Sequence, residues 1–255
     1  MNYLELAKKC ALDAGDLLLK YLGKIGSYEL KSHNSLLTEA DLESENLIIG
    51  EIKSYFPEHS FHAEESGRDI NDSGYLWLID PLDGTTNFAH SYPFFSVSIA
   101  LQVNGTVEVG VVYDPVKHEL FYAEKGRGSF LNDKQIAVSI VSSLDQSHLV
   151  TGFVHEHRWM VEKNLKYFEK FILSSQAVRR DGSAALDLCY VASGRYDGFW
   201  EMGLNPWDTA AGVLIAREAG GIVTDFTSND FKLESYELLA SNNLIHKNMV
   251  DMLKD

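Results

Sequence analysis

The chain has 255 residues, with 22 Lys and Arg against 37 Asp and Glu, and its formal net charge is −15. This charge disfavours non-specific binding to nucleic acids and to anionic membrane surfaces, while a hydrophobic content of 45% is ordinary for a globular protein. The two cysteines, Cys10 and Cys189, lie in apolar helical patterns without metal-ligand spacing, which predicts buried thiols in a reducing compartment. Because no apolar run reaches about 18 residues and no signal-type core follows Lys8 and Lys9, we expect a cytoplasmic protein.

The first half of the chain predicts two helices and an antiparallel sheet. Apolar residues recur at helical spacing over 3–22 and again from about 39 to 56, where Pro57 ends the pattern. A short strand over 26–31 and a polar loop over 32–35 are expected between the two helices. Alternating apolar runs predict the remaining strands, at 60–63, 75–79, 95–103, 107–113 and 119–123, with short hairpins near 126–128 and 132–133. Turn signals such as Asn104-Gly105 indicate an antiparallel meander.

From about residue 146 strands and helices alternate. The expected strands cover 148–153, 177–180, 196–202, 222–224 and 238–240, and the expected helices 158–173, 183–192, 206–219 and 244–253. We therefore divide the chain into an antiparallel half, 1–145, and an α/β half, 146–255, which together form one compact structural unit. This order predicts an α+β fold of stacked sheets and helix layers.

The most informative stretch is the acidic turn after the buried strand at 75–79, Asp80-Pro81-Leu82-Asp83-Gly84-Thr85-Thr86-Asn87-Phe88. Two carboxylates three positions apart are followed by a glycine that permits a sharp turn and by residues suited to a helix start. Carboxylates bind Mg²⁺, and free N–H groups at a helix start bind phosphate. The alternative is a solvated Asx turn. We disfavour it because a buried strand rarely ends in two acids without a cation to neutralise them.

Three acidic clusters need one explanation: Glu64-Glu65, Asp80 with Asp83, and Asp208 at the start of the helix expected over 206–219. Carboxylates brought together raise one another's pKa values unless cations intervene, and roughly two or three Mg²⁺ ions remove that conflict. No histidine forms a metal-ligand spacing with these acids, which disfavours zinc. We expect the three clusters to converge on one pocket.

Four motifs in order resemble the inositol monophosphatase family of Mg²⁺-dependent, lithium-sensitive phosphatases. They are Trp77 to His90, Trp207 to Gly212 with Gly220-Gly221 beyond it, Glu64-Glu65-Ser66, and Thr38-Glu39-Ala40-Asp41. The resemblance covers essentially the whole chain. It implies the layered α/β/α/β/α sandwich of the inositol monophosphatase and fructose-1,6-bisphosphatase type, a homodimer, and inhibition by lithium.

The resemblance also implies roles for individual residues. The metal ligands would be Glu64, Asp80, the Leu82 carbonyl, Asp83 and Asp208, with Asp80 bridging two ions and a third, weaker ion near Glu64. Glu64, and Thr85 paired with Asp41, would orient and deprotonate the attacking water, and the N–H groups of Gly84 and Thr85 would hold the phosphate. The substrate ring would contact Gly182, Ser183, Ala184, Glu201 and Asp208.

Our leading hypothesis is Mg²⁺-dependent hydrolysis of a phosphate monoester, with myo-inositol monophosphate as first candidate, by direct in-line attack of water. A rival of the same class is fructose-1,6-bisphosphatase activity or dual specificity. A rival of another class is a regulatory, protein-binding role in transcription, since some bacterial relatives act on transcription complexes. We expect neither direct nucleic-acid binding nor a membrane partner.

Overall fold

The computed structural model describes residues 2–24, 28–32, 35–155 and 157–254, and for residues 28–32 and 35–38 it describes the backbone alone. The chain begins with helix α1 (Tyr3–Tyr21), which the Asn2 side chain caps by accepting a hydrogen bond from the Glu5 N–H. Its buried residues recur at helical spacing, among them Leu6, Cys10 and Leu18. The helix expected over 3–22 is therefore confirmed, and both Cys10 and Cys189 are buried free thiols.

A hairpin of two short strands, β1 (Tyr28–Ser32) and β2 (Ser35–Thr38), connects α1 to helix α2 (Glu39–Tyr55). The strand expected over 26–31 is present from Tyr28, whereas residues 26–27 lie outside the described residues. The loop expected over 32–35 was partly wrong, because Ser32 and Ser35 pair with each other at the ends of the two strands. Strand β2 gives no alternating signal of its own and exists through its pairing with β1.

The first half of the chain builds an eight-stranded sheet in the order β10-β9-β8-β7-β6-β5-β3-β4. Its strands are β3 (Ser60–Ala63), β4 (Gly67–Asp69), β5 (Tyr75–Asp83), β6 (Ser96–Val103), β7 (Thr106–Asp114), β8 (Glu119–Glu124), β9 (Ser129–Leu131) and β10 (Lys134–Ile136). Strands β5 to β10 form the expected antiparallel meander, and β3 runs parallel to β5. Strand β4, an exposed edge strand, was not expected, because three residues without apolar alternation carry no strand signal.

Strand β5 runs to Asp83, four residues past its expected end at Ile79. Its pairing with β6 is regular up to Asp80 and resumes at Asp83, with a shift of register between them. Pro81 lies in this gap, where its missing N–H costs no ladder hydrogen bond. The irregularity separates the two aspartates that the acidic turn contributes to the site.

The second half builds a five-stranded sheet in the order β12-β11-β13-β15-β14. Its strands are β11 (His148–Thr151), β12 (Ala177–Arg179), β13 (Gly198–Met202), β14 (Ile222–Thr224) and β15 (Glu237–Ser241). Strand β11 is parallel to both neighbours, and β15 is antiparallel to both of its own. The helices are α4 (Arg158–Ser174), α5 (Ala184–Ala192), α6 (Pro206–Glu218) and α7 (His246–Leu253), in agreement with the sequence to within two residues. A single turn, α3 (Thr85–Ala89), follows β5, and a 3-10 turn, η1 (Leu144–Gln146), precedes β11.

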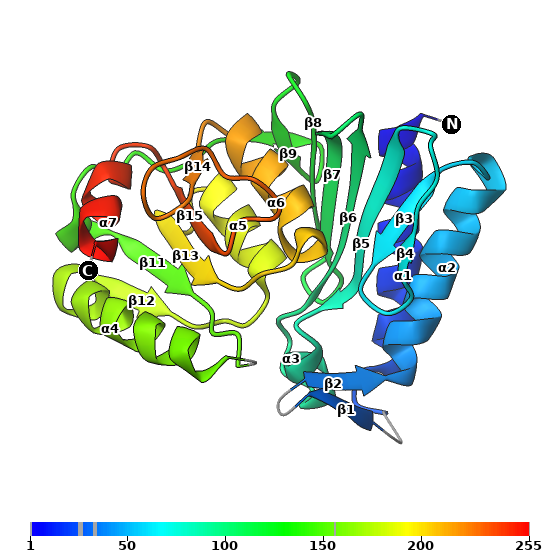
Figure 1. Ribbon diagram of the computed structural model, residues 1–255, viewed down its shortest axis with the longest axis horizontal. Coiled ribbons are helices and arrows are strands. Elements are labelled where there is room, and N and C mark those ends of the chain that lie inside the picture. Colours follow the sequence, from blue (N-terminus) through cyan, green and yellow to red (C-terminus); the bar gives the residue numbers. More distant parts are fainter. Residues whose placement is uncertain (1, 25–27, 33–34, 156, 255) are drawn as a thin grey trace.

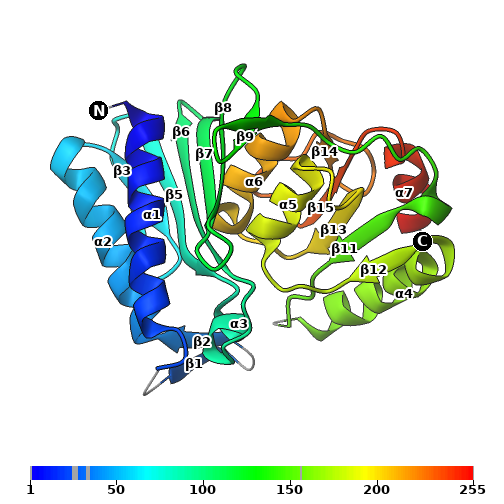
Figure 2. The same ribbon diagram turned by 180° about the vertical axis from the view of Figure 1, so that it is seen from behind.

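The elements stack in five layers (Figure 1). Helices α1 and α2 cover the outer face of the large sheet, α5 and α6 lie between the two sheets, and α4 and α7 cover the outer face of the small sheet, as the reverse view also shows (Figure 2). This arrangement confirms the α+β class and the α/β/α/β/α sandwich. One hydrophobic cluster joins α5 and α6 to both sheets, with Val112 from the large sheet and Phe199 from the small one. The division of the chain at residue 145 stays a prediction.

Helix α6 lies unusually close to the large sheet. Gly110 on β7 faces it, and a Cβ atom at that position would lie 2.8 Å from the Ala211 carbonyl oxygen. On its other side α6 touches α5, where a Cβ atom at Gly212 would lie 2.7 Å from the Cβ of Leu188. The two glycines let the helix enter the space between the sheets with its N-terminus toward the end of β5. Within the described residues no helix is long and apolar enough to cross a membrane.

We predict that Gly110→Ala lowers the free energy of unfolding by about 1–3 kcal/mol, because the added methyl group meets backbone atoms of α6 that cannot rotate away. Gly50→Ala is the control. Gly50 lies within α2 with no atom within 4 Å of an added Cβ, and the change should raise stability by about 0.5–1 kcal/mol. Urea unfolding of both variants is the measurement, and equal effects of the two substitutions would contradict the close packing of α6.

Candidate active site

A cavity of about 210 Å³ lies where β5 ends and α3, α5 and α6 begin. Its lining includes every residue that the sequence analysis assigned to the site except Asp41: Glu64, Asp80, Leu82, Asp83, Gly84, Thr85, Gly182, Ser183, Ala184, Glu201 and Asp208. Acids far apart in the chain therefore meet in one place, as expected. The lining residues that the sequence analysis missed are Gly152, Phe153, Arg180, Leu204 and Asn205. These residues lie in loops and at strand ends, and none belongs to a sequence motif that would have identified it as part of the site.

Asp80 lines this cavity and is 2% exposed. One of its carboxylate oxygens accepts a hydrogen bond from the Leu82 N–H at 3.0 Å, which holds the side chain against its own turn. The carbonyl of Leu82 in turn accepts the Thr85 hydroxyl at 3.0 Å. The pairing of Thr85 with Asp41 that the resemblance implies stays a prediction.

Gly84 has a conformation that the turn requires. Its φ is +92°, in the left-handed region, and a Cβ atom there would lie 3.1 Å from the Phe94 carbonyl oxygen and 3.2 Å from that of Gly182. Any other residue here would have a strained backbone conformation, and its Cβ atom would be crowded by the two carbonyl oxygens. This tight turn places the first backbone N–H groups of α3 at the cavity, where they lack partners within the helix.

Asp83 joins the two halves of the chain. Its Oδ2 atom accepts hydrogen bonds from the Ser183 hydroxyl at 2.5 Å and from the Ala185 N–H at 2.9 Å, at the start of α5. Burial raises the pKa of Asp83 to about 6, against the opposing effect of these two hydrogen bonds. These bonds hold the Asp83 side chain firmly against the start of α5.

Asp208 occupies the first turn of α6. Its Oδ2 atom accepts the Asn205 N–H at 2.7 Å, and Pro206 begins the helix. Burial raises the pKa of Asp208 well above its usual range, and the charge of Glu64 raises it further. Burial likewise raises the pKa of Asp80, followed by the charges of Glu64, Asp83, Asp208 and Asp41. These buried acids repel one another, and only bound cations allow all of them to be ionised together.

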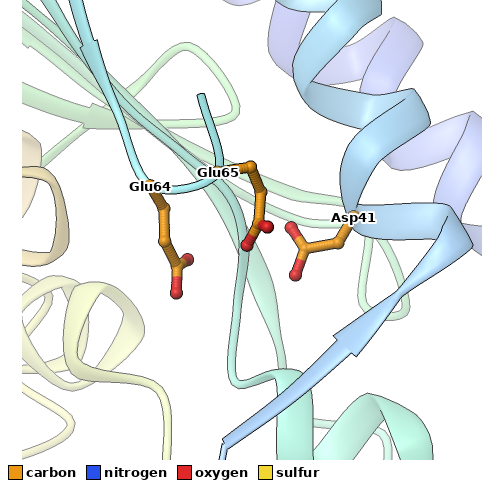
Figure 3. A group of neighbouring side chains, drawn as sticks. All are labelled: Asp41, Glu64 and Glu65. Carbon is orange, nitrogen blue, oxygen red and sulfur yellow. The ribbon is translucent and has the colours of Figure 1, made fainter. Parts of the chain in front are cut away.

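A second group of acids adjoins the first. Asp41 at the start of α2, and Glu64 and Glu65 after β3, each offer a ligand atom within 4.8 Å of the others (Figure 3). The turn that carries the two glutamates is held by Glu45, whose carboxylate accepts the N–H groups of Glu65 and Ser66, both at 2.8 Å. Asp41 is fully buried although it does not line the cavity itself. The sequence analysis placed Glu65 in an acidic cluster but gave it no role.

The donor chemistry of both groups fits Mg²⁺. All the candidate ligands are carboxylate or carbonyl oxygens, the hard donors that this ion prefers, and their mutual repulsion calls for positive charge. No cysteine lines the cavity in the described part of the chain, and no histidine does so either. The chemistry therefore favours magnesium over zinc.

Glu201 on β13 lies on the side of the cavity that the substrate ring is expected to occupy, and it is 6% exposed. Its carboxylate lies directly against Gly152: a Cβ atom there would be 2.2 Å from one oxygen and 2.3 Å from the other. Gly152 thus provides the space for this carboxylate. Burial raises the pKa of Glu201 to about 8, while the charge of Arg180 opposes the rise.

We predict that Glu201→Gln becomes progressively more stable than the wild-type protein as the pH rises from 5 to 8 in the absence of divalent metal. The native state keeps a proton on Glu201 that the unfolded chain loses near pH 4.5, so wild-type stability falls with rising pH across this window. The difference should reach about 1 kcal/mol or more. Urea unfolding of both proteins at three pH values is the measurement, and parallel pH curves would rule out the raised pKa.

The same set of elements and motifs occurs in known proteins. The family model described as "Inositol monophosphatase family" matches residues 2–254. Inositol-1-monophosphatase of Synechocystis sp. is 45% identical over 254 residues, covering 99% of this chain and 88% of that protein. Nus factor SuhB of Escherichia coli is 42% identical over 255 residues, covering 99% and 96%.

Solved structures agree in fold. The inositol monophosphatase of Anabaena (Nostoc) sp. superimposes with a TM-score of 0.89 at 46% identity, covering 98% of this chain and 94% of that one. The Thermotoga maritima IMPase gives a TM-score of 0.93 at 38% identity, covering 99% and 97%. With the motifs, the layered fold and the full-length matches in agreement, this chain belongs to the inositol monophosphatase family.

Proposed function

We propose that the protein is a Mg²⁺-dependent phosphatase that hydrolyses a phosphate monoester, with myo-inositol monophosphate as the first candidate substrate. The observation that carries the proposal is the convergence of Glu64, Asp80 and Asp208 on one cavity beside the start of α3. Phosphate-ester hydrolysis depends mainly on positioning and on neutralising charge, which such a site supplies. Membership of the inositol monophosphatase family supports the same activity.

The residues divide into a metal-holding side and a phosphate-holding side. Glu64, Asp80, Asp83, Asp208 and the Leu82 carbonyl would hold the ions, roughly two or three in number, with Asp41 and Glu65 available beside Glu64. When bound there, Mg²⁺ lowers the pKa of water and neutralises charge on the phosphate and on the leaving oxygen. The N–H groups of Gly84 and Thr85 would hold the phosphate at the start of α3. Glu64 would accept the proton of the attacking water, with Thr85 orienting it.

The substrate ring would lie against the start of α5 and the end of β13. Gly182, Ser183 and Ala184 present small side chains and backbone atoms to the cavity, so a polyol can approach closely. Glu201 would accept hydrogen bonds from its hydroxyl groups. By family resemblance we also propose a cytoplasmic homodimer that lithium inhibits.

Fructose-1,6-bisphosphate hydrolysis, alone or beside inositol phosphate hydrolysis, is the rival within this class. A protein-binding role in transcription is the second candidate function, favoured by relatives that carry the name Nus factor SuhB. A phosphate-release screen over inositol phosphates, sugar phosphates and nucleotides, with and without Mg²⁺, separates the substrates. If Asp83→Asn abolishes both phosphatase turnover and the protein's biological role in the cell, that role depends on the enzymatic activity. If the biological role persists without turnover, it depends on protein binding.

We predict that Asp208→Asn reduces kcat for myo-inositol monophosphate by about 100-fold or more while the protein stays folded. The amide removes negative charge from the metal-holding side yet keeps an oxygen that can accept the Asn205 N–H. The measurements are phosphate release in saturating Mg²⁺ and circular dichroism. Asp251→Asn, an exposed change on α7 that removes an ion pair with Lys254, is the matched control and should leave turnover intact. Near-normal Mg²⁺-dependent turnover in Asp208→Asn would refute the proposal.

A further inference from the structure

Helix α2 buries polar side chains on the face where a helix normally buries apolar ones. Asp41, Ser44 and Glu45 follow one another at the spacing that brings residues to one side of a helix, and all three are buried. Further along the same side the buried residues are Ile48 and Ile52. A buried hydroxyl or carboxylate is costly unless hydrogen bonds replace its contacts with water. The partners of Ser44 and Glu45 therefore show what these two residues do.

Glu45 holds the turn that carries Glu64, which we call the glutamate turn, residues 64–66. Each oxygen of its carboxylate accepts one backbone N–H, one from Glu65 and the other from Ser66, both at 2.8 Å. Hydrogen bonds to an ionised acceptor are stronger than those between neutral groups. The two bonds fix the backbone directly after Glu64, whose own N–H donates to the Ile79 carbonyl of β5 at 3.2 Å.

Ser44 holds the acidic turn at the end of β5. Its hydroxyl donates to the Pro81 carbonyl at 3.0 Å, in a bond that is fully buried. Pro81 lies between Asp80 and Leu82, which supply a carboxylate and a carbonyl to the cavity. The pairing of β5 with β6 is irregular at this point, so the hydroxyl fixes the backbone where the register of the sheet shifts.

Two neighbouring residues of one helix thus hold both turns. Ser44 and Glu45 are not among the described residues that line the cavity, so they act through the backbone that carries the ligands. Figure 3 shows Asp41, one turn earlier on α2, projecting toward the glutamate turn. Because a helix is rigid, it can keep the two turns at a set separation before a cation binds. A site that is organised in advance loses less free energy on binding.

We propose that Ser44 and Glu45 are positioning residues that, from one helix, fix the glutamate turn relative to the acidic turn and so set the affinity of the site for Mg²⁺. The inference rests on the proposed phosphatase function and deepens it by naming residues that determine metal affinity without being ligands. Residues that orient metal ligands typically change metal affinity by about 10–100-fold when they are replaced.

The test measures Mg²⁺ binding directly. The metal-free protein is titrated with MgCl₂, and the rise of its thermal unfolding midpoint with Mg²⁺ concentration gives the dissociation constant. We expect Glu45→Gln to raise this constant about tenfold or more, because the amide keeps one acceptor oxygen and turns an N–H donor toward the other backbone N–H. Ser44→Ala should raise it about threefold without any change of charge.

Glu43→Gln is the matched control. Glu43 is exposed on the same helix, and its replacement removes the same charge two residues away from Glu45. Because exposed charges are screened, the dissociation constant should stay within about twofold of wild type. The Mg²⁺ concentration that gives half-maximal phosphate release should shift in parallel with the dissociation constant in each of the three variants.

Three outcomes would overturn the inference. In the first, Ser44→Ala and Glu45→Gln lower the unfolding midpoint equally with and without Mg²⁺ and leave the dissociation constant unchanged, so the residues only stabilise the fold. In the second, Glu43→Gln weakens binding as much as Glu45→Gln, so charge alone is responsible. In the third, Mg²⁺ does not stabilise the wild-type protein at all. If Glu45→Gln does not fold, Ser44→Ala decides. The proposed function fails separately, if the wild-type protein binds Mg²⁺ but releases phosphate from no monoester.

Discussion

Repulsion among buried carboxylates is the constraint on which the rest of this structure depends. Asp80 and Asp83 are almost completely buried in one cavity beside the partly buried Asp208, and the charges of Asp83 and Asp208 raise the pKa of Asp80. An isolated ionised carboxylate in such a place is very costly, so the arrangement makes sense only with positive charge among the acids. Cations bound among these acids in the native state alone would therefore stabilise the protein.

The fold holds these acids in place through contacts between distant segments. Asp83 at the end of the large sheet accepts hydrogen bonds from the start of α5, and the Ser98 hydroxyl of β6 donates to the Trp207 carbonyl beside Asp208 at 3.2 Å. Glycines at 110 and 212 let α6 lie close to its neighbours. The site is thus built on the ends of rigid elements rather than on one loop, which keeps mutually repelling groups at fixed positions.

The two sides of the cavity differ in chemistry. The side formed by Glu64, Asp80, Asp83 and Asp208 is uniformly acidic, whereas Arg180 also lines the cavity and its charge opposes the raised pKa of Glu201. Concentrated negative charge suits the binding of cations, whereas donors and acceptors in balance suit the binding of a polar ligand.

Local sequence determined the elements with clear periodicity and the turn chemistry of the site. Apolar spacing predicted α1, α2 and the four helices of the second half, and alternation predicted the meander from β5 to β8. The acids before Gly84 were recognisable because a buried strand rarely ends in two carboxylates without a cation, whereas the acid at the start of α6 was recognised through the motif around it. The short strands β2 and β4 carried no such signal, since pairing with a neighbouring strand alone stabilises them.

Only the tertiary structure decided which side chains meet. It joined Asp83 to Ser183, placed Glu201 against Gly152, and grouped Asp41 with Glu65, none of which follows from spacing along the chain. Arg180 shows the limit most clearly: in the sequence it is one of two adjacent arginines, and only packing sets it apart from Arg179 by turning it to the cavity. Periodicity reports which face of an element is buried, whereas the neighbours of that face are set by how the sheets and helices stack.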